Sequence, residues 1–559
     1  MDLLVIGASA AGLKAACRAR RLMPKANVTV LEATDYVSWA GCGLPYYLSG
    51  DIEDFQALLT TPYKVEKTPE YFAAAKGITV RPAVRALRLD PQAQTVEARD
   101  MRSGEMLAFH YDELIIATGG RPILPSVPGV DLPGVTPFTR PEEAIALRQA
   151  AERGQISRVA VVGGGFIGCE MVEAFRALWG LEVVLFEERN QVLKDILGQA
   201  LGRVVAGLLR RRGVELHLEH RLEGLAAQDG KLQVTAAGRT FDGFDRVLLT
   251  MGVRPSVDLA AEAGAQIGPT GGIVVDSRMH TSLPHVFAVG DCAQVAHALT
   301  GKAHHQPLSS LATRMGRVAA DVIAGMDDSL GPVLGTVCLK LFDTTVAAVG
   351  LTASRAVREG FKGELVWGSF HDRAHFYPEA QDLWAVLVYD AHSGRLLGAQ
   401  ALGSERAVTL INTASTMIRD GLTLHQMRDF EPGYAPPYAA PLDPLHYLAY
   451  AALAQLEENV NAFPPQDLLK YADGSLVIDV REPAERETKP FPAPCRRLLT
   501  IPYTQLRARI EEIPAGERIA LVCARGPRAA ESVRILKEHG LEATYMGGGL
   551  AFWEEMPPS

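Results

Sequence analysis

The sequence has few cysteines and no long apolar run. Its seven cysteines in 559 residues are an odd number at irregular spacings without a C-x-x-C pair, which argues against a disulfide framework and a zinc site. No apolar run approaches the roughly 20 residues that cross a bilayer, and no secretory leader precedes the first expected strand. The sequence therefore predicts a cytoplasmic protein without a membrane partner.

A large excess of positive charge is also missing. The net charge is −9, which argues against a general nucleic-acid partner, although a local basic patch can still bind a phosphorylated small molecule. His304 and His305 are adjacent, but no cysteine or carboxylate accompanies them at ligand spacing, so we expect no metal site.

What the sequence does contain is enough length for several hydrophobic cores. A chain of 559 residues is expected to form roughly three or four domains. Apolar β-type segments alternate with helical patterns to about residue 325, which indicates α/β layers around mostly parallel sheets. A strand-rich region at about 332–445, a proline-rich junction at 431–444 and a final alternating α/β stretch follow.

Two βαβ units each carry a glycine-rich turn between a strand and a helix. The first turn is Gly7-Ala-Ser-Ala-Ala-Gly12, with Ser9 in place of the usual middle glycine, and Glu32 ends the next strand. Gly7 permits the tight turn and Gly12 allows close helix packing. The N–H groups at the start of the helix can then bind a pyrophosphate, and Glu32 can bind a ribose hydroxyl.

The second turn, Gly163-Gly-Gly-Phe-Ile-Gly168, is a complete G-x-G-x-x-G motif, and Glu187 ends the strand that follows. The glycines of one such motif can serve tight turns alone, but two motifs with matching acidic ends fit that explanation poorly. A carboxylate at position 187 accepts a hydrogen bond from a 2′-hydroxyl and repels a 2′-phosphate. We expect a preference for NADH over NADPH, softened by the neighbouring Arg189.

Over about residues 1–445 the sequence resembles the flavin-dependent pyridine nucleotide-disulfide oxidoreductases. The matching segments are the two glycine turns, Ala117-Thr118-Gly119, Thr250-Met251-Gly252 and Val286–Asp291. The resemblance implies an α/β fold class, with two Rossmann-like FAD- and NAD-binding domains of the glutathione reductase type and an α+β dimerisation domain. It also implies a homodimer.

The same resemblance implies the cofactor contacts. The predicted FAD contacts are Gly7, Ser9, Ala10, Ala11, Gly12, Glu32, Val84, Ala117, Thr118, Gly119 and Asp291. The predicted NADH contacts are Gly163, Gly165, Phe166, Ile167, Gly168, Glu170, Glu187 and Gly252. Among these residues, Asp291 is expected to contact the ribityl chain, Phe166 to cover the flavin, and Glu170 to lie near the nicotinamide.

Cys42 is the single candidate redox cysteine. It lies in Ser38-Trp-Ala-Gly-Cys42-Gly-Leu-Pro-Tyr-Tyr47, and no other cysteine lies within five residues of it. A lone thiol beside a flavin cycles through a sulfenic acid, a mixed disulfide or a persulfide. A buried structural cysteine is the alternative. The string is similar to the coenzyme A-disulfide reductase branch, which often has asparagine where this chain has Gly41.

That branch implies a coenzyme A site and a shared active site. The expected coenzyme A contacts are Lys14, Arg18, Arg21, Ser38 and Cys42. The three basic residues can share one helix face, although an ordinary solvated charged face would look the same. Tyr377 and Tyr434 match the tyrosines that the partner subunit places near the redox cysteine, where their hydroxyls could protonate a departing thiolate. A packing role is the alternative for both.

The C-terminal region contains a second cysteine site. Cys523-Ala-Arg-Gly-Pro-Arg528 follows an apolar strand and leads into a helix, so its N–H groups can converge on the sulfur and stabilise a thiolate or the outer sulfur of a persulfide. Arg528 adds a fixed positive charge. Residues 462–559 resemble rhodanese sulfurtransferases, which implies a rhodanese-like α/β domain. A purely structural domain is the alternative.

The predicted domains follow from these motifs. They are an FAD-binding domain (1–112 and 250–328), an NAD(P)H-binding domain (113–249), a dimerisation domain (329–445), a linker helix (446–461) and a rhodanese domain (462–559).

Together the motifs predict an NADH-oxidising flavoenzyme that reduces coenzyme A persulfide or polysulfide and releases hydrogen sulfide. Cys523 would deliver the sulfur to coenzyme A, because a fused sulfur carrier has little use in an enzyme that reduces symmetrical disulfides alone. Coenzyme A-disulfide reduction is the main alternative. An NADH oxidase or peroxidase, with Cys42 cycling through sulfenic acid, and a sulfur-relay module are two others.

Overall fold

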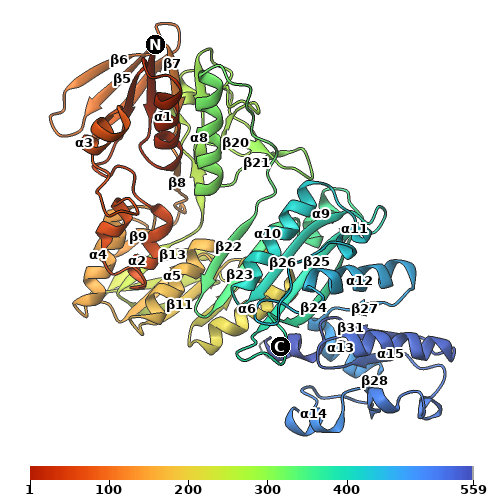
Figure 1. The fold of residues 1–559 in the computed structure, drawn as a ribbon. Coiled ribbons are helices and arrows are strands. Elements are labelled where there is room, and N and C mark those ends of the chain that lie inside the picture. The colour runs from red at the N-terminus through yellow and green to blue at the C-terminus, as the bar shows by residue number, and fades with distance from the viewer. Residues whose placement is uncertain (557–559) are drawn as a thin grey trace. The chain divides into compact units, whose positions relative to one another are not determined.

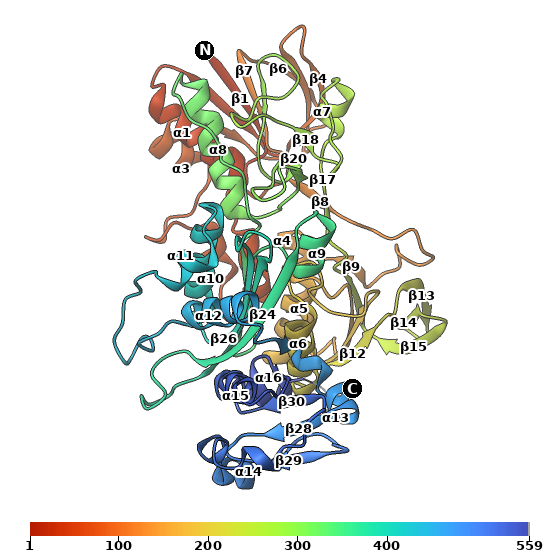
Figure 2. The same ribbon diagram turned by 90° about the vertical axis from the view of Figure 1, so that its right-hand side faces the viewer.

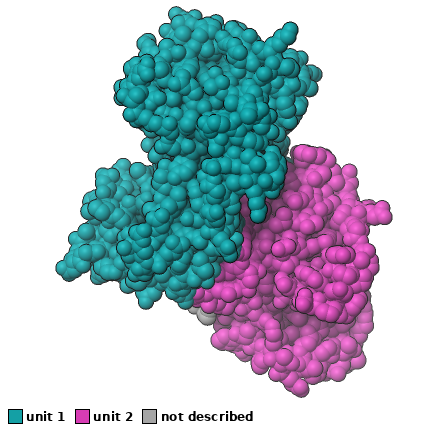
Figure 3. Space-filling view, turned by 60° about the vertical axis from the view of Figure 1, so that its left-hand side comes forward, with its two compact units in different colours: residues 1–186, 221–333 teal, residues 187–220, 334–559 magenta. Residues whose placement is uncertain are grey.

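A computed structural model describes residues 1–556 of the chain. The chain divides into two compact units, coloured separately in Figure 3. The first comprises residues 1–186 and 221–333, and the second comprises residues 187–220 and 334–559. Residues 557–559, the end of the expected rhodanese domain, lie outside the described residues.

The first unit contains a five-stranded parallel sheet in the order β19-β7-β1-β2-β3. Its strands are β1 (Asp2–Ile6), β2 (Asn27–Leu31), β3 (Thr79–Arg81), β7 (Glu113–Ile116) and β19 (Val286–Ala288). The strands are almost wholly apolar because helices cover the sheet. Two of these helices, α1 (Ala10–Leu22) and α8 (Ser309–Ile323), lie side by side in Figure 1.

The expected boundary at residues 112 and 113 falls directly before β7. Because β7 pairs with β1 in this sheet, the chain leaves the first nucleotide-binding fold after residue 116. An antiparallel sheet of β4 (Val84–Asp90), β5 (Thr95–Asp100) and β6 (Met106–His110) lies between β3 and β7 in the sequence.

The other glycine turn follows a strand of a second parallel sheet. Its first-unit strands run in the order β11-β10-β16-β9; they are β9 (Val135–Pro137), β10 (Arg158–Val162), β11 (Glu182–Glu187) and β16 (Arg246–Leu249). Helix α4 (Pro141–Glu152) precedes β10, and α5 (Phe166–Ala177) follows it. The antiparallel strands β13 (Leu222–Gln228), β14 (Lys231–Ala236) and β15 (Arg239–Phe244) lead into β16.

The second unit is built around an antiparallel sheet in the order β22-β23-β26-β25-β24. The strands are β22 (Val337–Leu341), β23 (Thr344–Gly350), β24 (Gly363–His371), β25 (Asp382–Asp390) and β26 (Leu396–Gly403). Almost every residue of β25 and β26 is buried, because α10 (Arg406–Arg419) packs on this sheet, as does α12 (Pro444–Glu457). Helix α12 begins two residues before the expected linker helix at 446–461 and ends four residues before its expected end.

The last hundred residues form a smaller sheet in the order β27-β31-β30-β28-β29, with all pairings parallel. The strands are β27 (Ala462–Phe463), β28 (Leu476–Asp479), β29 (Leu498–Thr500), β30 (Ile519–Val522) and β31 (Ala543–Met546). Figure 2 shows α13 (Leu468–Gly474), α15 (Pro527–Glu538) and α16 (Gly549–Glu554) around it. Among residues 1–556, none of the helices has the length and apolar character of a membrane span.

Candidate active site

The first glycine turn joins β1 to α1 and leaves no room for side chains. Gly7 has a φ of +112°, and a Cβ there would collide with the carbonyl oxygen of Ala117. A Cβ on Gly12 would collide with the carbonyl oxygen of Gly7. Ser9 is the N-cap residue of α1, but its side chain accepts no capping hydrogen bond from the helix N–H groups. Only glycine allows this close approach of helix and strand, and it leaves the first N–H groups of α1 available to a pyrophosphate.

Glu32 lies at the carboxyl end of β2. Its carboxylate accepts hydrogen bonds from the backbone N–H of Ala8 (2.9 Å) and from the backbone and hydroxyl of Thr34 (2.9 and 2.8 Å). Its carbonyl oxygen accepts from the N–H of Val84 at 2.7 Å. The chain thus holds Glu32, Val84 and the glycine turn at one edge of the sheet.

The other expected FAD contacts follow neighbouring strands at the same edge. Ala117, Thr118 and Gly119 come directly after β7, and Asp291 lies in the short 3₁₀ helix η4 (Gly290–Cys292) after β19. Burial raises the pKa of Asp291, partly offset by His305, whose Nε2 lies 2.9 Å from the Asp291 carbonyl oxygen. Such an edge, where parallel strands end, is where dinucleotides bind in this fold class. The residues present therefore fit FAD.

The second glycine turn repeats this arrangement between β10 and α5. Gly163 has a φ of +109°, and a Cβ there would lie 2.6 Å from the carbonyl oxygen of Thr250, while a Cβ on Gly168 would collide with Gly163. A Cβ on Gly165 would meet nothing within 4 Å. The turn is therefore open on the side where a pyrophosphate approaches, which fits a nicotinamide dinucleotide. Phe166 and Ile167 begin α5.

The acidic residue at the end of β11 is largely buried. Glu187 is 8% exposed, and its carboxylate accepts a hydrogen bond from the backbone N–H of Arg189 at 2.8 Å. The Arg189 guanidinium is paired with Asp195 at 2.7 Å. This ion pair is exposed and partly balances the charge of the Arg189 side chain.

Glu170 in α5 has a strongly shifted pKa. Burial raises the pKa of Glu170 to about 8, the charge of Glu173 adds to the increase, and a hydrogen bond with Tyr46 opposes it. Tyr46 belongs to α2 (Leu44–Leu48), directly after Cys42. The contact therefore links the thiol segment to the second dinucleotide-binding fold. Tyr46 lies in the sequence string around Cys42, but nothing in the sequence alone indicates this contact.

Cys42 is an exposed thiol in the 3₁₀ helix η1 (Gly41–Gly43). Its Sγ lies 3.1 Å from the Oγ of Ser309, the first residue of α8. All seven cysteines are free, so Cys42 has no disulfide partner in the chain. Ser309 carries no sequence motif and is separated from Cys42 by 267 positions, so only the fold reveals this contact.

The expected coenzyme A contacts have different surroundings. Arg18 Nε lies 2.6 Å from Oδ1 of Asp321, which is 2% exposed, so this arginine holds α1 against α8. Arg21 is exposed, and its Nε lies 3.3 Å from the carbonyl oxygen of Cys17. Arg18 therefore has a structural partner that its sequence context does not predict. This pairing leaves Lys14 and Arg21 as better candidates for phosphate binding.

Ser38 lies in a strained segment before Cys42. Its φ is +54°, a value that non-glycine residues adopt rarely, and its carbonyl oxygen accepts a hydrogen bond from Nζ of Lys67. Burial lowers the pKa of Lys67. Lys67 therefore lies close to the thiol segment, although no sequence motif indicates it.

Tyr377 and Tyr434 both lie in the second unit and are exposed, at 37% and 48%. Phe376 and Tyr438 are more exposed, at 68% and 73%. A backbone hydrogen bond of 3.3 Å from Ala374 to Pro436 brings the two segments together. Large exposed aromatic side chains that gather on one surface are typical of a protein interface.

The C-terminal cysteine is enclosed by its loop. Cys523 is 1% exposed, and its Sγ accepts hydrogen bonds from the N–H groups of Gly526 (3.1 Å) and Ala529 (3.4 Å). The N–H groups thus converge on the sulfur as expected. Burial nevertheless outweighs them and the charge of Arg528, and raises the pKa of the Cys523 thiol. The expected stabilisation of a free thiolate is therefore incomplete.

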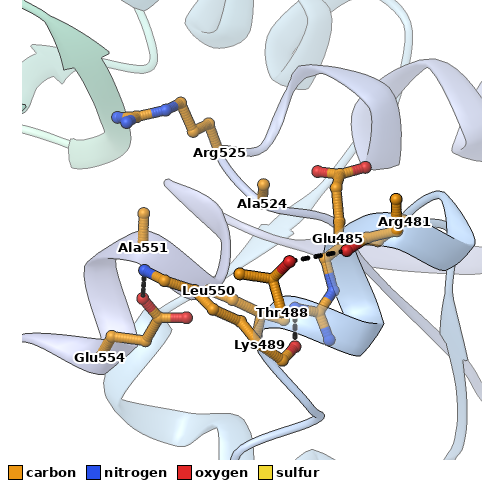
Figure 4. Close-up of a pocket in the computed structure, with 10 residues that line it drawn as sticks. Arg481, Glu485, Thr488, Lys489, Ala524, Arg525, Leu550, Ala551 and Glu554 are labelled. Carbon is orange, nitrogen blue, oxygen red and sulfur yellow. Dashed lines mark hydrogen bonds and ion pairs between the residues drawn. The ribbon is translucent and has the colours of Figure 1, made fainter.

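Both arginines of this loop are paired with carboxylates. Arg528 donates two hydrogen bonds of 2.6 Å to Glu485. Arg525 points away from the loop, as Figure 4 shows, donates to the carbonyl oxygen of Phe370 at 3.0 Å and forms an ion pair with Asp382. Phe370 and Asp382 belong to the antiparallel sheet of the same unit. Arg528 is predictable from the sequence, whereas the ion pairs of Arg525, Glu485 and Asp382 become visible only in the fold.

A pocket with a volume of about 380 Å³ lies beside this loop. Figure 4 shows side chains that line it. Its lining residues are Arg481, Ala484, Glu485, Thr488, Lys489, Ala524, Arg525, Leu550, Ala551 and Glu554. Among residues 1–556, no group of three or more His, Cys, Asp and Glu side chains could hold a metal ion.

The pyridine nucleotide-disulphide oxidoreductase family matches residues 1–307, and its dimerisation domain matches residues 337–443. The chain belongs to this family. The predicted family and fold class are therefore confirmed, and the family binds FAD and NAD(P)H.

Several known proteins are similar to this chain over most of its length. It is 34% identical to the NAD(P)H coenzyme A polysulfide/persulfide reductase of Pyrococcus horikoshii, over 80% of this chain and 97% of the relative. It is 26% identical to the coenzyme A disulfide reductase of Staphylococcus aureus strain JH9, over 80% and 99%. The solved structure of an NAD-dependent persulfide reductase from A. fulgidus covers 99% of this chain and 100% of its own, with a TM-score of 0.93 and 34% identity.

Proposed function

We propose that this pyridine nucleotide-disulphide oxidoreductase oxidises NADH and reduces coenzyme A persulfide or polysulfide, with hydrogen sulfide as the product. The single exposed thiol of Cys42 supports this proposal most directly, because an unpaired thiol must form its intermediate with a sulfur atom of the substrate. The printed activities of the Pyrococcus and A. fulgidus relatives support the same substrate class.

The chemistry at Cys42 has two steps. The Cys42 thiolate attacks the inner sulfur of CoA–S–SH, forms a mixed disulfide and releases HS⁻. Two electrons and one proton then convert the mixed disulfide into the Cys42 thiolate and CoA–SH. Bound FAD would supply these electrons from NADH. Ser309, at 3.1 Å from the sulfur, can donate a hydrogen bond to the regenerated thiolate.

The active site is proposed to need two copies of the chain. Tyr377 and Tyr434 of one subunit would face Cys42 of the other in a homodimer, and their hydroxyls would supply the proton to a departing thiolate. Their exposure and the match to a dimerisation domain support this arrangement. Lys14, Arg21 and Ser38 would bind coenzyme A, with Arg18 held in the α1–α8 contact.

The C-terminal domain is proposed to be a rhodanese-like sulfurtransferase. Cys523 would carry a sulfane sulfur as a persulfide, whose anionic outer sulfur the loop N–H groups stabilise. The outer sulfur would take a proton from water, and a coenzyme A thiolate would then attack it and leave with it as CoA–S–SH, which breaks the S–S bond and regenerates the Cys523 thiolate. Seven free cysteines fit a reducing compartment such as the cytoplasm.

Coenzyme A-disulfide reduction is the second candidate, supported by the similarity to the staphylococcal relative. The same Cys42 would attack CoA–S–S–CoA and form the same mixed disulfide, with a coenzyme A thiolate as the leaving group. The two activities therefore differ in the substrate and in the need for Cys523.

Steady-state NADH oxidation by the purified flavoprotein tests the proposal. Coenzyme A persulfide, coenzyme A disulfide, polysulfide and oxygen are compared for the wild type, Cys42→Ser, Cys523→Ser and, as a control for an exposed thiol, Cys338→Ser. We expect Cys42→Ser to lose at least about 100-fold on every sulfur substrate, and Cys523→Ser to lose turnover of polysulfide alone. Fastest turnover of coenzyme A disulfide, with polysulfide reduction unaffected by Cys523→Ser, would contradict the ranking.

A further inference from the structure

The hairpin that carries Tyr377 is closed tightly at its base. Residues 372–381 connect β24 to β25. The Asp372 carboxylate accepts a hydrogen bond from the N–H of Gln381 at 3.0 Å, and the Asp372 N–H donates to the Gln381 carbonyl oxygen at 2.9 Å. Tyr377 lies beyond this base and is 37% exposed. The position of its hydroxyl therefore depends on how firmly the two strand ends are held.

Arg525 of the cysteine loop contacts both strand ends at this base. Its guanidinium donates to the carbonyl oxygen of Phe370, in β24, at 3.0 Å and forms an ion pair with Asp382, the first residue of β25. The Arg525 side chain is 29% exposed, and Figure 4 shows it directed away from the loop. A planar guanidinium can bind two acceptors at once in a fixed geometry. One side chain therefore ties β24 to β25 where the hairpin begins and ends.

The backbone of Arg525 gives this contact a fixed starting point. A Cβ on Gly549 would lie 2.6 Å from the backbone nitrogen of Arg525, so the two loops are in close contact. Burial raises the pKa of the Cys523 thiol, and loop N–H groups, that of Arg525 among them, oppose this increase. The same residue therefore belongs to the cradle of Cys523 through its N–H group and to the base of the hairpin through its guanidinium.

At neutral pH, Arg525 is the cation that holds Asp382. The other candidate is His371, whose Nδ1 lies 3.7 Å from Oδ1 of Asp382. Burial lowers the pKa of His371, and the charge of Arg525 lowers it further, although Asp382 opposes both effects. The Nδ1 atom has no hydrogen-bond partner within residues 1–556. The imidazole is therefore neutral at neutral pH, and the charge of Asp382 is balanced by Arg525.

We propose that Arg525 is a positioning residue for turnover at Cys42, because it holds the hairpin that places the Tyr377 hydroxyl near the departing thiolate. The C-terminal domain then takes part in reduction even when no sulfur passes through Cys523. This inference rests on the proposed role of Tyr377 in the homodimer and adds the group that positions it. The guanidinium makes the contact, so a change in the cysteine loop that leaves Arg525 paired does not disturb the hairpin.

Coenzyme A disulfide isolates this effect, because its reduction does not require Cys523. The Cys42 thiolate forms a bond to one sulfur of CoA–S–S–CoA, and the S–S bond of the substrate breaks. The departing coenzyme A thiolate takes the proton of the Tyr377 hydroxyl, which then regains a proton from water. The mixed disulfide is reduced at the expense of NADH, as in persulfide turnover. A proton donor held out of place slows the first step without weakening substrate binding.

The experiment measures steady-state NADH oxidation by the full-length flavoprotein with coenzyme A disulfide at pH 8, where His371 is neutral. Arg525→Met, Tyr377→Phe and the double variant are compared with the wild type. We expect Tyr377→Phe to lower kcat at least about tenfold and Arg525→Met at least about fivefold, each with KM within about twofold of the wild-type value. In the Tyr377→Phe background we expect Arg525→Met to cost less than about twofold, because the group that it positions is already gone.

Two further variants separate positioning from general damage. Asp382→Asn weakens the same contact from the antiparallel sheet without changing the cysteine loop, and we expect kcat to fall at least about threefold. It decides the question even where Arg525→Met fails to fold. The matched control is Arg507→Met, which breaks the exposed Arg507–Glu538 pair of the same C-terminal domain; we expect the wild-type kcat.

A wild-type kcat for Arg525→Met and Asp382→Asn overturns the inference. A loss of the same size in the Tyr377→Phe background also overturns it, because Arg525 would then act on the fold and not through Tyr377. A wild-type kcat for Tyr377→Phe overturns the proposed role of Tyr377 itself. The two failures are therefore distinguishable.

Discussion

Glu170 is the half-buried carboxyl group whose titration has the clearest consequence. Its pKa is raised to about 8 from 4.5, so the side chain is neutral at pH 7 and stays protonated in the folded protein when the unfolded chain has already lost its proton. The stability that this proton supplies is fully present below about pH 4.5 and is lost as the pH rises through about 8.

Glu170→Gln tests this directly, because glutamine has nearly the same shape and is neutral at every pH. We expect similar melting temperatures for variant and wild type at pH 5, and a variant that is more stable by several degrees at pH 9, where the wild type buries a charge. Thermal unfolding of the flavoprotein at both pH values measures the difference. Glu262→Gln, on an exposed helix position, is the control; a constant difference across the pH range would contradict the prediction.

At the scale of residues, the sequence predicted the glycines and cysteines that stand in recognisable motifs. Gly7, Gly163, Cys42 and Cys523 stand in patterns that few structural roles require. Their partners could not be predicted, because ordinary residues such as Ser309 and Asp382 gain a role only when distant segments meet. The same limit applies to Arg18, whose partner Asp321 lies on another helix.

At the scale of elements, the βαβ units were predictable because buried parallel strands are continuous apolar runs that end in glycine turns. Strand β1 is followed by the Gly7 turn, β10 by the Gly163 turn, and β30 by the Cys523 loop. The place of β7 was harder to predict. A four-residue apolar segment looks the same in either nucleotide-binding fold, and only its pairing with β1 assigns it to the first sheet.

Strand β25 holds a polar group that its surroundings do not satisfy. Tyr389 is 0% exposed, and its hydroxyl has no hydrogen-bond partner within residues 1–556. Burial raises the pKa of Tyr389, so the phenol remains neutral at any ordinary pH. A buried hydroxyl without a partner costs about 1–3 kcal/mol of desolvation.

We expect Tyr389→Phe to leave the free energy of unfolding unchanged or to increase it by about 1 kcal/mol. Trp384→Phe in the same strand is the contrasting variant, because it removes the Nε1 hydrogen bond of 3.2 Å to the carbonyl oxygen of Ala551; we expect a loss of about 1 kcal/mol. Urea unfolding followed by circular dichroism measures both. Destabilisation of Tyr389→Phe by as much as Trp384→Phe would show that the hydroxyl has a partner.

At the scale of the whole molecule, the antiparallel sheet and the C-terminal domain form one compact unit. Ser369 Oγ donates to the carbonyl oxygen of Gly548 at 2.6 Å, and Gly547 packs against the ring of Trp367. Gly549 in turn lies against Ala524 and Arg525 of the cysteine loop. The dimerisation domain thus supports the second cysteine site, which a sequence divided into separate domains does not reveal.

Gly547→Ala tests this support without touching either cysteine. A Cβ at this position would lie 2.6 Å from Cε3 of Trp367, so the indole ring or the glycine loop must move, and overpacking of this kind costs about 1–3 kcal/mol. We expect a shift in tryptophan fluorescence and slower sulfur loading of Cys523, while coenzyme A disulfide reduction at Cys42 stays at the wild-type rate. The control is Gly474→Ala, where a Cβ meets nothing within 4 Å. Wild-type loading by Gly547→Ala would mean that the loop keeps its shape without this contact, and a parallel loss of Cys42 turnover would mean that the damage extends beyond the C-terminal domain.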